Sequence, residues 1–443
     1  MKKILVVTLS LVLVAVMSFS FAGCDLTAQY DKYIAQEMRG CFDYFWNETQ
    51  TSESYVSAYG LVKDRSTENS VSSIAAIGFG LAAYMIGAEE GYVTKAEAEE
   101  RTLGTLKTVR ALQQRANVSQ EGFLSHFLDM KTAGRAAGSE ISSIDTAILL
   151  CGALTAGEYF GGEIKQLANE IYANVNWTAM RMTQYGKHYI AMELLSNGTP
   201  KQPWDYYAEQ LMIYVLGAGS PTAEYRLDDT EYYDFTRAQG TYAGHTFYYS
   251  WFGSIFTYQF SHAFIDFRNK VDKNGTDWWA NSVEASLAAY LYCRDNAGSS
   301  KSFKEGGWGL TACDRRGSYG GTLGFPPRGW NSNEDPDYSS YEGTIAPYGA
   351  ISSVVFTPKQ SLKALKYYQT SDSLKRIRGD YGLLDSYNLD QMWFATDYVG
   401  IDKGITLMML YNYTCGGIWE QFMANQYVQN GMQVLGFTET AAQ

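Results

Sequence analysis

The sequence is poor in proline, histidine and charge, and each shortage limits what the protein can be. Its 443 residues include 8 prolines and 4 histidines, and only 19% of them are charged. The histidines, at positions 126, 188, 245 and 262, are too scattered to compose an evident metal site, so no metal is expected. Hydrophobic residues make up 46% of the chain, which allows a large core and excludes a disordered protein.

Cysteine is scarce, and the common nucleotide and protease motifs are absent. The 6 cysteines lack CxxC spacing, so a disulfide framework is not expected. There is no Walker loop, no dinucleotide fingerprint, no HExxH helix and no Gly-x-Ser-x-Gly elbow. The net charge of −12 argues against nucleic acid and against anionic glycans or lipids as main partners. We therefore expect no cofactor and no nucleic-acid partner.

The most apolar segment lies at the N-terminus and has the form of a secretory signal. Two lysines precede an apolar stretch over 4–22. The sequence FAGC at 21–24 resembles a bacterial lipobox, which implies cleavage before Cys24 and lipidation of its thiol. An uncleaved anchor is the alternative, because the stretch approaches the length of a membrane helix. We expect removal of 1–23 to leave one extracytoplasmic domain, 24–443, on a membrane surface or its periplasmic face.

Helical periodicity dominates the rest of the chain. One kind of predicted helix is amphipathic, as at 94–115, and the other is apolar nearly all round, as at 70–87 and 141–157. Apolar helices need neighbours on every side, which two concentric rings supply. We predict an all-α (α/α)6 toroid; an α-solenoid is the alternative, although no fixed repeat supports it. The predicted helices are roughly 27–47, 69–88, 94–115, 141–160, 163–175, 203–217, 249–268, 277–295, 346–354, 358–370, 403–414 and 416–429.

Two carboxylates introduce the apolar run that begins SEISSIDTAILL at 139. Ser142 and Asp145 fit a capping box, in which Asp145 would only stabilise the start of a helix. An unpaired carboxylate in apolar surroundings is costly. The alternative is therefore that Glu140 and Asp145 open onto a cleft and take part in chemistry.

Other acids stand at the heads of apolar segments, and each has a structural alternative. Asp64 could form an ion pair with Arg65, and Asp402 could cap a helix. Glu209 is predicted to lie inside a helix, where no cap is needed. In a toroid the inner-helix ends surround one cleft. Converging carboxyls there would suit glycoside hydrolysis, since one protonates the leaving oxygen and another activates water or attacks.

Aromatic residues are unusually abundant, at 15% of the chain with 35 tyrosines and 10 tryptophans. Tyrosine and tryptophan combine a flat apolar face with a polar tip, which suits a sugar ring. The stretch 297–345, rich in glycine and aromatics, is predicted to form a wall of the cleft. We expect sugar platforms at Trp204, Trp308, Trp330 and Tyr341.

Several segments, in order along the chain, resemble the bacterial glucoamylase-like family, some of whose members are endo-β-1,2-glucanases of glycoside hydrolase family 144. They include GLVKDRS (60–66), SEISSIDTAILLCGALTA (139–156), EQLMIYVLGAGSPT (209–222), YQFSHAFIDFR (258–268) and YVGIDKGITLMMLYNY (398–413). The resemblance implies an α/α toroid that hydrolyses a β-linked glucan, with inversion as in most related toroidal glycosidases. It implies a cleft containing Asp64, Arg65, His126, Asp145, Glu209, His262 and Asp402.

The sequence departs from the family at Tyr341-Glu342, often two acids there, and at Tyr411, often a glutamate. Linkage or chain-end preference could therefore differ. Our hypothesis is a lipid-anchored, monomeric hydrolase of β-1,2-glucan or its oligosaccharides. Its general acid would be Glu209, its base Asp145 or Asp402. A surface glycan-binding lipoprotein and a hydrolase of another linkage are the alternatives. Further expected substrate contacts are Glu140, Asp266, Arg268 and Glu342.

Overall fold

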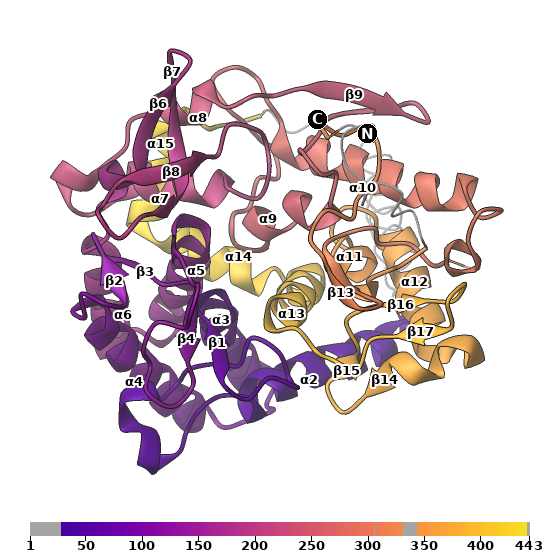
Figure 1. The fold of residues 1–443 in the computed structure, drawn as a ribbon, viewed down its shortest axis with the longest axis horizontal. Coiled ribbons are helices and arrows are strands. Elements are labelled where there is room, and N and C mark those ends of the chain that lie inside the picture. The colour runs from indigo at the N-terminus through magenta and orange to yellow at the C-terminus, as the bar shows by residue number, and fades with distance from the viewer. Residues whose placement is uncertain (1–27, 305, 331–342, 441–443) are drawn as a thin grey trace, which may run out of the picture.

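The computed structural model describes residues 28–304, 306–330 and 343–440, which form a ring of helices (Figure 1). The predicted signal segment and two predicted substrate contacts, Tyr341 and Glu342, lie outside these residues. Buried hydrophobic residues from Tyr33 near the start to Leu435 near the end belong to one continuous core.

The helices alternate along the chain between an inner and an outer ring, as the two kinds of predicted helix require (Figure 1). The inner helices are α3 (Ile74–Glu89), α5 (Ser143–Phe160), α7 (Leu211–Gly219), α9 (Phe260–Phe264), α11 (Pro347–Ile351) and α13 (Gly400–Thr414). The outer helices are α2 (Asp31–Asn47), α4 (Lys95–Gln113), α6 (Gly162–Ala173), α10 (Trp278–Asp295) and α12 (Pro358–Thr370). The short α8 (Thr230–Asp234) lies between α7 and α9 in sequence. The prediction of an all-α toroid is confirmed.

The inner helices α3 and α5 show why an apolar sequence occupies the centre. Both are buried along almost their whole length, so neither presents a polar face to water. They cross where Gly78 meets Gly152, and a Cβ on Gly152 would lie 1.8 Å from the Gly78 carbonyl oxygen. Only glycine allows so close an approach. The outer helix α4, by contrast, is stabilised at its exposed start by a capping box between Thr94 and Glu97.

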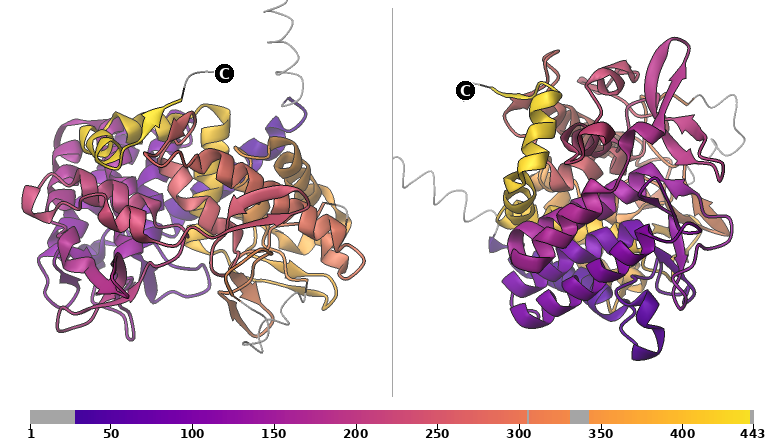
Figure 2. Two further views of the ribbon diagram at one scale, coloured as in Figure 1. Left: turned by 90° about the horizontal axis from the view of Figure 1, so that it is seen from above. Right: turned by 90° about the vertical axis from the view of Figure 1, so that its left-hand side faces the viewer.

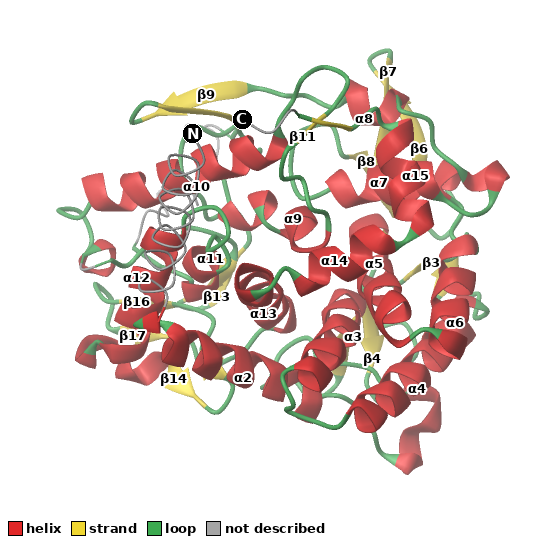
Figure 3. Cartoon of the chain, turned by 180° about the vertical axis from the view of Figure 1, so that it is seen from behind, coloured by secondary structure: helices red, strands yellow, loops and turns green. Residues whose placement is uncertain are grey.

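The two sides of the ring are different. Strands and long loops gather on one face, while α14 (Gly417–Ala424) and α15 (Gln426–Val434) lie toward the other (Figures 2 and 3). On the loop face β5 (Ile141–Ser142), β7 (Lys187–Leu194), β6 (Arg181–Gln184) and β8 (Pro200–Pro203) form an antiparallel sheet in which β7 pairs with the other three. The strand β5 runs directly into α5, so this sheet fixes the start of that inner helix.

The remaining strands form two-stranded antiparallel pairs. These are β1 (Val71–Ser73) with β4 (Phe127–Asp129), β2 (Ser119–Gln120) with β3 (Phe123–Leu124), β9 (Gln239–Tyr242) with β10 (His245–Tyr248), β11 (Lys270–Val271) with β18 (Thr438–Glu439), β12 (Cys313–Arg315) with β13 (Ser318–Gly320), β14 (Arg378–Gly379) with β15 (Gly382–Leu383), and β16 (Tyr387–Asn388) with β17 (Trp393–Phe394). Short 3-10 helices include η1 (Glu53–Ala58), η2 (Trp177–Met180), η3 (Ala223–Tyr225), η4 (Ile255–Tyr258), η5 (Lys301–Phe303) and η8 (Asp372–Ile377).

Three predicted helices are wrong in extent. The helix expected over 203–217 begins only at Leu211, because the chain before it is still leaving β8. The helix expected over 249–268 reduces to η4 and α9. The helix expected over 416–429 is two helices, α14 and α15, because Asn425 is extended and its side chain accepts the backbone N–H groups that begin α15.

The described cysteines are all free, so no disulfide forms among them, as the spacing predicted. Cys151 lies in the core of α5, in agreement with its apolar sequence surroundings. None of the helices within the described ranges has the length and apolar character needed to cross a membrane.

Candidate active site

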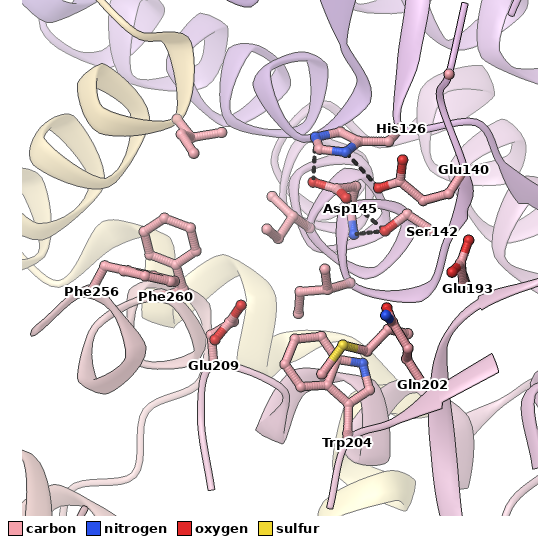
Figure 4. A pocket seen from close by; sticks show the side chains of 15 residues that line it. His126, Glu140, Ser142, Asp145, Glu193, Gln202, Trp204, Glu209, Phe256 and Phe260 are labelled. Atoms are coloured by element: carbon pink, nitrogen blue, oxygen red, sulfur yellow. Dashed lines mark hydrogen bonds and ion pairs between the residues drawn. The ribbon is translucent and has the colours of Figure 1, made fainter. Parts of the chain in front are cut away.

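A cavity of about 460 Å³ lies at the start of α5, between the β5–β8 sheet and the turn before α7 (Figure 4). We call it the Glu209 cavity. Side chains from five parts of the chain meet there, at 126, 138–148, 192–209, 256–260 and 401. They include His126, Glu140, Asp145, Trp204, Glu209 and Phe260. The structure thus brings together acids that are far apart in sequence.

His126 links two of these acids. Its Nδ1 lies 2.8 Å from Glu140 Oε1, and its Nε2 lies 3.5 Å from Asp145 Oδ1. Its ring stacks on Phe127, with 3.6 Å between ring centroids. Burial disfavours the imidazolium, but the Asp145 charge and the Glu140 hydrogen bond outweigh it and raise the pKa of His126 to about 9. The hydrogen bond from His126 in turn lowers the pKa of Glu140.

Asp145 combines the two positions that its sequence left open. The Ser142 hydroxyl oxygen accepts the Asp145 backbone N–H at 3.2 Å, which caps α5. The same hydroxyl donates to Asp145 Oδ2 at 2.6 Å. The other carboxylate oxygen faces His126 on the wall of the Glu209 cavity (Figure 4). Capping therefore accounts for the serine and the backbone, while the carboxylate remains directed at the cavity.

The sequence predicted Glu209 inside a helix. In the structure it lies in the turn before α7, so this prediction is wrong. Its backbone carbonyl accepts a hydrogen bond from the Ser261 hydroxyl at 2.5 Å, which ties the turn to α9. Phe256 and Phe260 stand beside its carboxyl group (Figure 4). Burial, aided by the charge of Asp145, raises the pKa of Glu209 to about 7. A carboxyl of that pKa can donate a proton near neutral pH.

The only group in the described chain with metal-ligand spacing is His126, Glu140 and Asp145, whose ligand atoms lie within 4.8 Å of one another. A metal-bound imidazole must lose a proton from the coordinating nitrogen. His126 is paired with both carboxylates, so a metal ion here would have to displace the proton that these pairs hold. The structure thus shows an ion-paired histidine at this position.

A second cluster surrounds Arg65, which the sequence placed beside Asp64. Arg65 Nε lies 3.6 Å from Asp64, and its Nη1 lies 3.2 Å from Asp314 and 3.3 Å from Asp397. Burial raises the pKa of Asp64, which also interacts with the charges of His126 and Asp145. The predicted ion pair is thus present. Sequence reasoning missed Asp314 and Asp397, which sit on or beside short hairpins without periodic pattern.

Asp402 lies in a different place from Glu209. It is in the first turn of α13 and is 3% exposed, and Val399, not Asp402, is the N-cap. With Asp385 it borders a cavity of about 10 Å³. Within the described residues, Asp402 Oδ2 and Asp385 Oδ1 have no hydrogen-bond partner. Burial and the neighbouring Asp385 raise the pKa of Asp402. Its side chain does not line the Glu209 cavity, although that of Ile401 does.

Next to Asp402, a buried ion pair holds α13 against α2. Lys403 Nζ lies 2.9 Å from Glu37 Oε1, and both side chains are almost fully buried. Lys403 also donates to the Tyr381 carbonyl at 3.1 Å. This arrangement is structural, because the cavity beside it has room for about one water molecule.

His262 was predicted in the cleft and lies in the core instead. It is 1% exposed, and its Nε2 lies 2.9 Å from the Ser282 hydroxyl. Burial lowers its pKa to about 3, so it is neutral. Its ring packs against Phe267 and Phe356. The prediction of a substrate contact at this residue is wrong.

Asp266 and Arg268 pair with each other at 2.8 Å, beyond the end of α9 at Phe264. Arg268 lies over the ring of Trp419, 4.2 Å from its centroid. Neither residue lines the Glu209 cavity.

The three tryptophans predicted as sugar platforms lie in three different environments. Trp204 lines the Glu209 cavity, but it is 7% exposed and its Nε1 donates to the Ser143 hydroxyl at 3.1 Å. Trp308 is 1% exposed and belongs to the core, so it is not a platform. Trp330 packs on Phe252, with 4.6 Å between ring centroids, away from the Glu209 cavity.

The fold is a two-ring helical toroid with paired carboxyl groups on one cavity, and comparison with known proteins gives the family. The model of the Glycoamylase family, described as "Putative glucoamylase", matches residues 201–426, slightly more than half of the chain. The chain belongs to this family.

Among individual relatives, an exo β-1,2-glucooligosaccharide sophorohydrolase (non-reducing end) of Parabacteroides distasonis is 26% identical over 438 residues. The match covers 88% of this chain and 56% of that protein, so the chain spans about half the length of this curated relative. A solved structure named as a "putative glucoamylase" of Bacteroides uniformis is 27% identical, with a TM-score of 0.80, covering 93% of this chain and 98% of that one.

An endo-β-1,2-glucanase of Chitinophaga pinensis, solved with sophorotriose and glucose, is 24% identical with a TM-score of 0.79. It covers 93% of this chain and 99% of the Chitinophaga chain. At this identity the likeness establishes the fold alone, and it agrees with the two-ring architecture described above.

Proposed function

We propose that the protein is a glycoside hydrolase that cleaves β-1,2-glucan or its oligosaccharides. The family and the names of its relatives support this substrate. The observation that carries the proposal is Glu209, a carboxyl whose pKa is raised to about 7 on the wall of a cavity that it shares with Asp145.

In this proposal Glu209 is the general acid. Its proton passes to the glycosidic oxygen as the bond to the anomeric carbon breaks. A carboxyl with a pKa near the working pH is both protonated often enough and acidic enough for this task. The flanking Phe256 and Phe260 rings reduce the contact of the carboxyl with water, in keeping with the raised pKa of Glu209.

Asp145 is the proposed partner that orients and deprotonates the attacking water. Its carboxylate is on the wall of the same cavity, and it is held by Ser142 and His126. Water attack on the face opposite the leaving group inverts the anomeric configuration, as the family resemblance implies. Asp402 is the second candidate for the base, but it is separated from the cavity by the wall that includes Ile401.

The test is a panel of glucans with different linkages, incubated with the protein at several pH values, with reducing ends counted. Release of reducing ends from β-1,2-glucan alone supports the proposal. Release from another linkage would reassign the substrate. Binding of β-1,2-glucan without new reducing ends would show a glycan-binding protein and would refute the hydrolase.

We also propose that Cys24 carries a lipid and holds a monomeric hydrolase at a membrane, on the cell surface or the periplasmic face. The lipobox-like FAGC sequence supports this, and it lies outside the residues that the structure describes. Metabolic labelling with a fatty-acid probe should mark the wild type and not Cys24→Ser. Equal labelling of the variant would refute lipidation at this thiol. Light scattering of the chain without residues 1–24 should give the monomer mass.

A further inference from the structure

A second cavity, of about 480 Å³, opens on the other side of Arg65. We call it the Trp393 cavity. The β12–β13 hairpin forms one wall and the β16–β17 hairpin with the chain after it forms the other. The residues that matter here are Arg65, Asp314, Tyr319, Trp393, Phe394 and Asp397. Asp314 and Tyr319 lie in the 297–345 stretch predicted to form a cleft wall, but only Arg65 was named individually as a substrate contact.

The two cavities are neighbours on one face of the ring. Arg65 lines the Trp393 cavity, while the preceding Asp64 interacts with the charges of His126 and Asp145 in the Glu209 cavity. The Asp64 carbonyl accepts the backbone N–H of Gly400 at 2.7 Å, one residue before Ile401, which lines the Glu209 cavity. A single layer of chain therefore separates the two cavities. A linear ligand that crosses this layer would contact both.

The charges of the Trp393 cavity favour a ligand without net charge. Two guanidinium groups, Arg65 and Arg315, and two carboxyl groups, Asp314 and Asp397, line the cavity, so its formal charges balance. The ion pairs of Arg65 fix its guanidinium in place. Asp397 is saturated, because Ser66 and Thr67 donate to its oxygens at 2.7–3.0 Å. Asp314 is the carboxyl best placed to accept hydrogen bonds from a ligand, since its oxygens contact Arg65 only at 3.2 Å.

Two aromatic rings complete the cavity. Tyr319 is 47% exposed, and Trp393 is partly exposed on the opposite wall. Large exposed rings beside fixed charged groups are costly for a bare surface and typical of a binding site. A ring face offers apolar contact to the C–H face of a sugar, while carboxylate and guanidinium groups hydrogen-bond its hydroxyls.

We propose that the Trp393 cavity binds a glycosyl unit of the substrate chain, remote from the unit cleaved beside Glu209. The unit stacks on Trp393 or Tyr319, and its hydroxyls bond to Asp314 and Arg65. This subsite rests on the proposed hydrolase function and deepens it. It makes chain length a determinant of turnover, because only longer oligosaccharides reach both cavities.

The experiment compares Trp393→Ala with wild type on β-1,2-gluco-oligosaccharides from the disaccharide to the hexasaccharide. The variant should lose about tenfold in kcat/KM on the longest substrates, the worth of one aromatic contact, and little on the shortest substrate that is cleaved. Trp393→Phe keeps a ring and should restore most of the activity. Met392→Ala is the matched control, since Met392 is the 66% exposed neighbour that does not line the cavity.

Each outcome distinguishes the subsite from the hydrolase. A loss that is equal at every length, or no loss, overturns the subsite and leaves the hydrolase intact. Should wild type cleave none of the substrates, the hydrolase proposal fails. Calorimetric binding of the hexasaccharide then decides the subsite: it stands if Trp393→Ala weakens binding about tenfold, and falls if affinity is unchanged or if wild type does not bind. Circular dichroism and thermal unfolding confirm that each variant is folded.

Discussion

The Glu209 cavity and the Asp385–Asp402 pair both contain buried carboxyl groups, but they differ in whether a ligand can reach those groups. Burial raises the pKa of Glu209 and of Asp402 alike. The space beside Glu209 is about 460 Å³, whereas the space beside Asp402 is about 10 Å³. A sugar fits only the first. A raised pKa therefore identifies a candidate acid only when an open cavity accompanies it.

The difference comes from the elements that surround each acid. Glu209 lies in a turn, so its side chain faces the opening between α5 and α9. Asp402 lies within the first turn of α13, beside the buried Lys403–Glu37 pair. The turn exposes its acid to a ligand, while the helix packs its acid into the ring. Substitutions near Glu209 should therefore change turnover, and substitutions around Asp402 and Lys403 should mainly change stability.

The largest effect is expected for Glu209→Gln. Removing the general acid should lower kcat on β-1,2-glucan by about 10²–10⁴-fold. The unfolding temperature should not fall, because glutamine keeps the shape and the neutral state. Reducing-end kinetics and a thermal melt measure both. A variant with near-normal turnover would show that Glu209 is not the acid.

A substitution in the ion pair beside Asp402 should lower stability rather than turnover. Lys403→Met leaves Glu37 buried without its cation and should cost about 3–5 kcal/mol of unfolding free energy. Turnover per folded molecule should stay close to wild type. Urea titration measures the stability, and activity at low urea measures the turnover. A stable but inactive Lys403→Met protein would contradict the structural role.

The third test separates the two candidate bases. Asp145→Asn should lower kcat by about 100-fold or more and change stability by about 1 kcal/mol. Asp402→Asn imitates a protonated Asp402 and should lose less activity than Asp145→Asn. Both are compared on one substrate after folding is verified by circular dichroism. An equal or larger loss in Asp402→Asn would assign the base to Asp402 and require proton transfer through the cavity wall.

The smallest effect concerns pH and stability at His126. The pKa of His126 rises on folding from 6.5 to about 9, so the protonated ring stabilises the fold. That stabilisation is complete below pH 6.5 and is lost as pH rises through 9, by about 1–2 kcal/mol after screening. Urea unfolding of wild type and His126→Gln over this range measures it. A slope that persists unchanged in the variant would refute the assignment.

Sequence alone predicted much of the fold because the inner helices carry an all-round apolar signal. The starts of α3, α5 and α13 follow from it within a few residues. The short helices α7 and α9 were overextended, because aromatic and apolar residues in the preceding loops imitate helical periodicity. The local sequence pattern of a buried loop that packs against the ring of helices is the same as that of a helix in this position.

The site was predicted less completely than the fold. Glu140 and Asp145 were expected at a cleft because they introduce an apolar run, His126 was expected from the family resemblance, and the structure places all three together. Asp314 and Asp385 were missed, because they meet their partners only through tertiary packing of hairpins. His262 was wrongly predicted to line the cleft, because the local sequence around a histidine in an apolar segment is the same whether the side chain lines a cleft or fills a core.

The most direct test of Glu209 as the acid is to measure how the cleavage rate of the Glu209→Gln variant depends on the leaving group of the substrate. An aryl β-sophoroside with a highly acidic phenol needs no proton to depart, whereas glucan does. Glu209→Gln should therefore cleave the aryl substrate at close to the wild-type rate while remaining at least about 100-fold impaired on β-1,2-glucan. Equal impairment on both substrates would contradict proton donation by Glu209, and with it the role given to the open cavity.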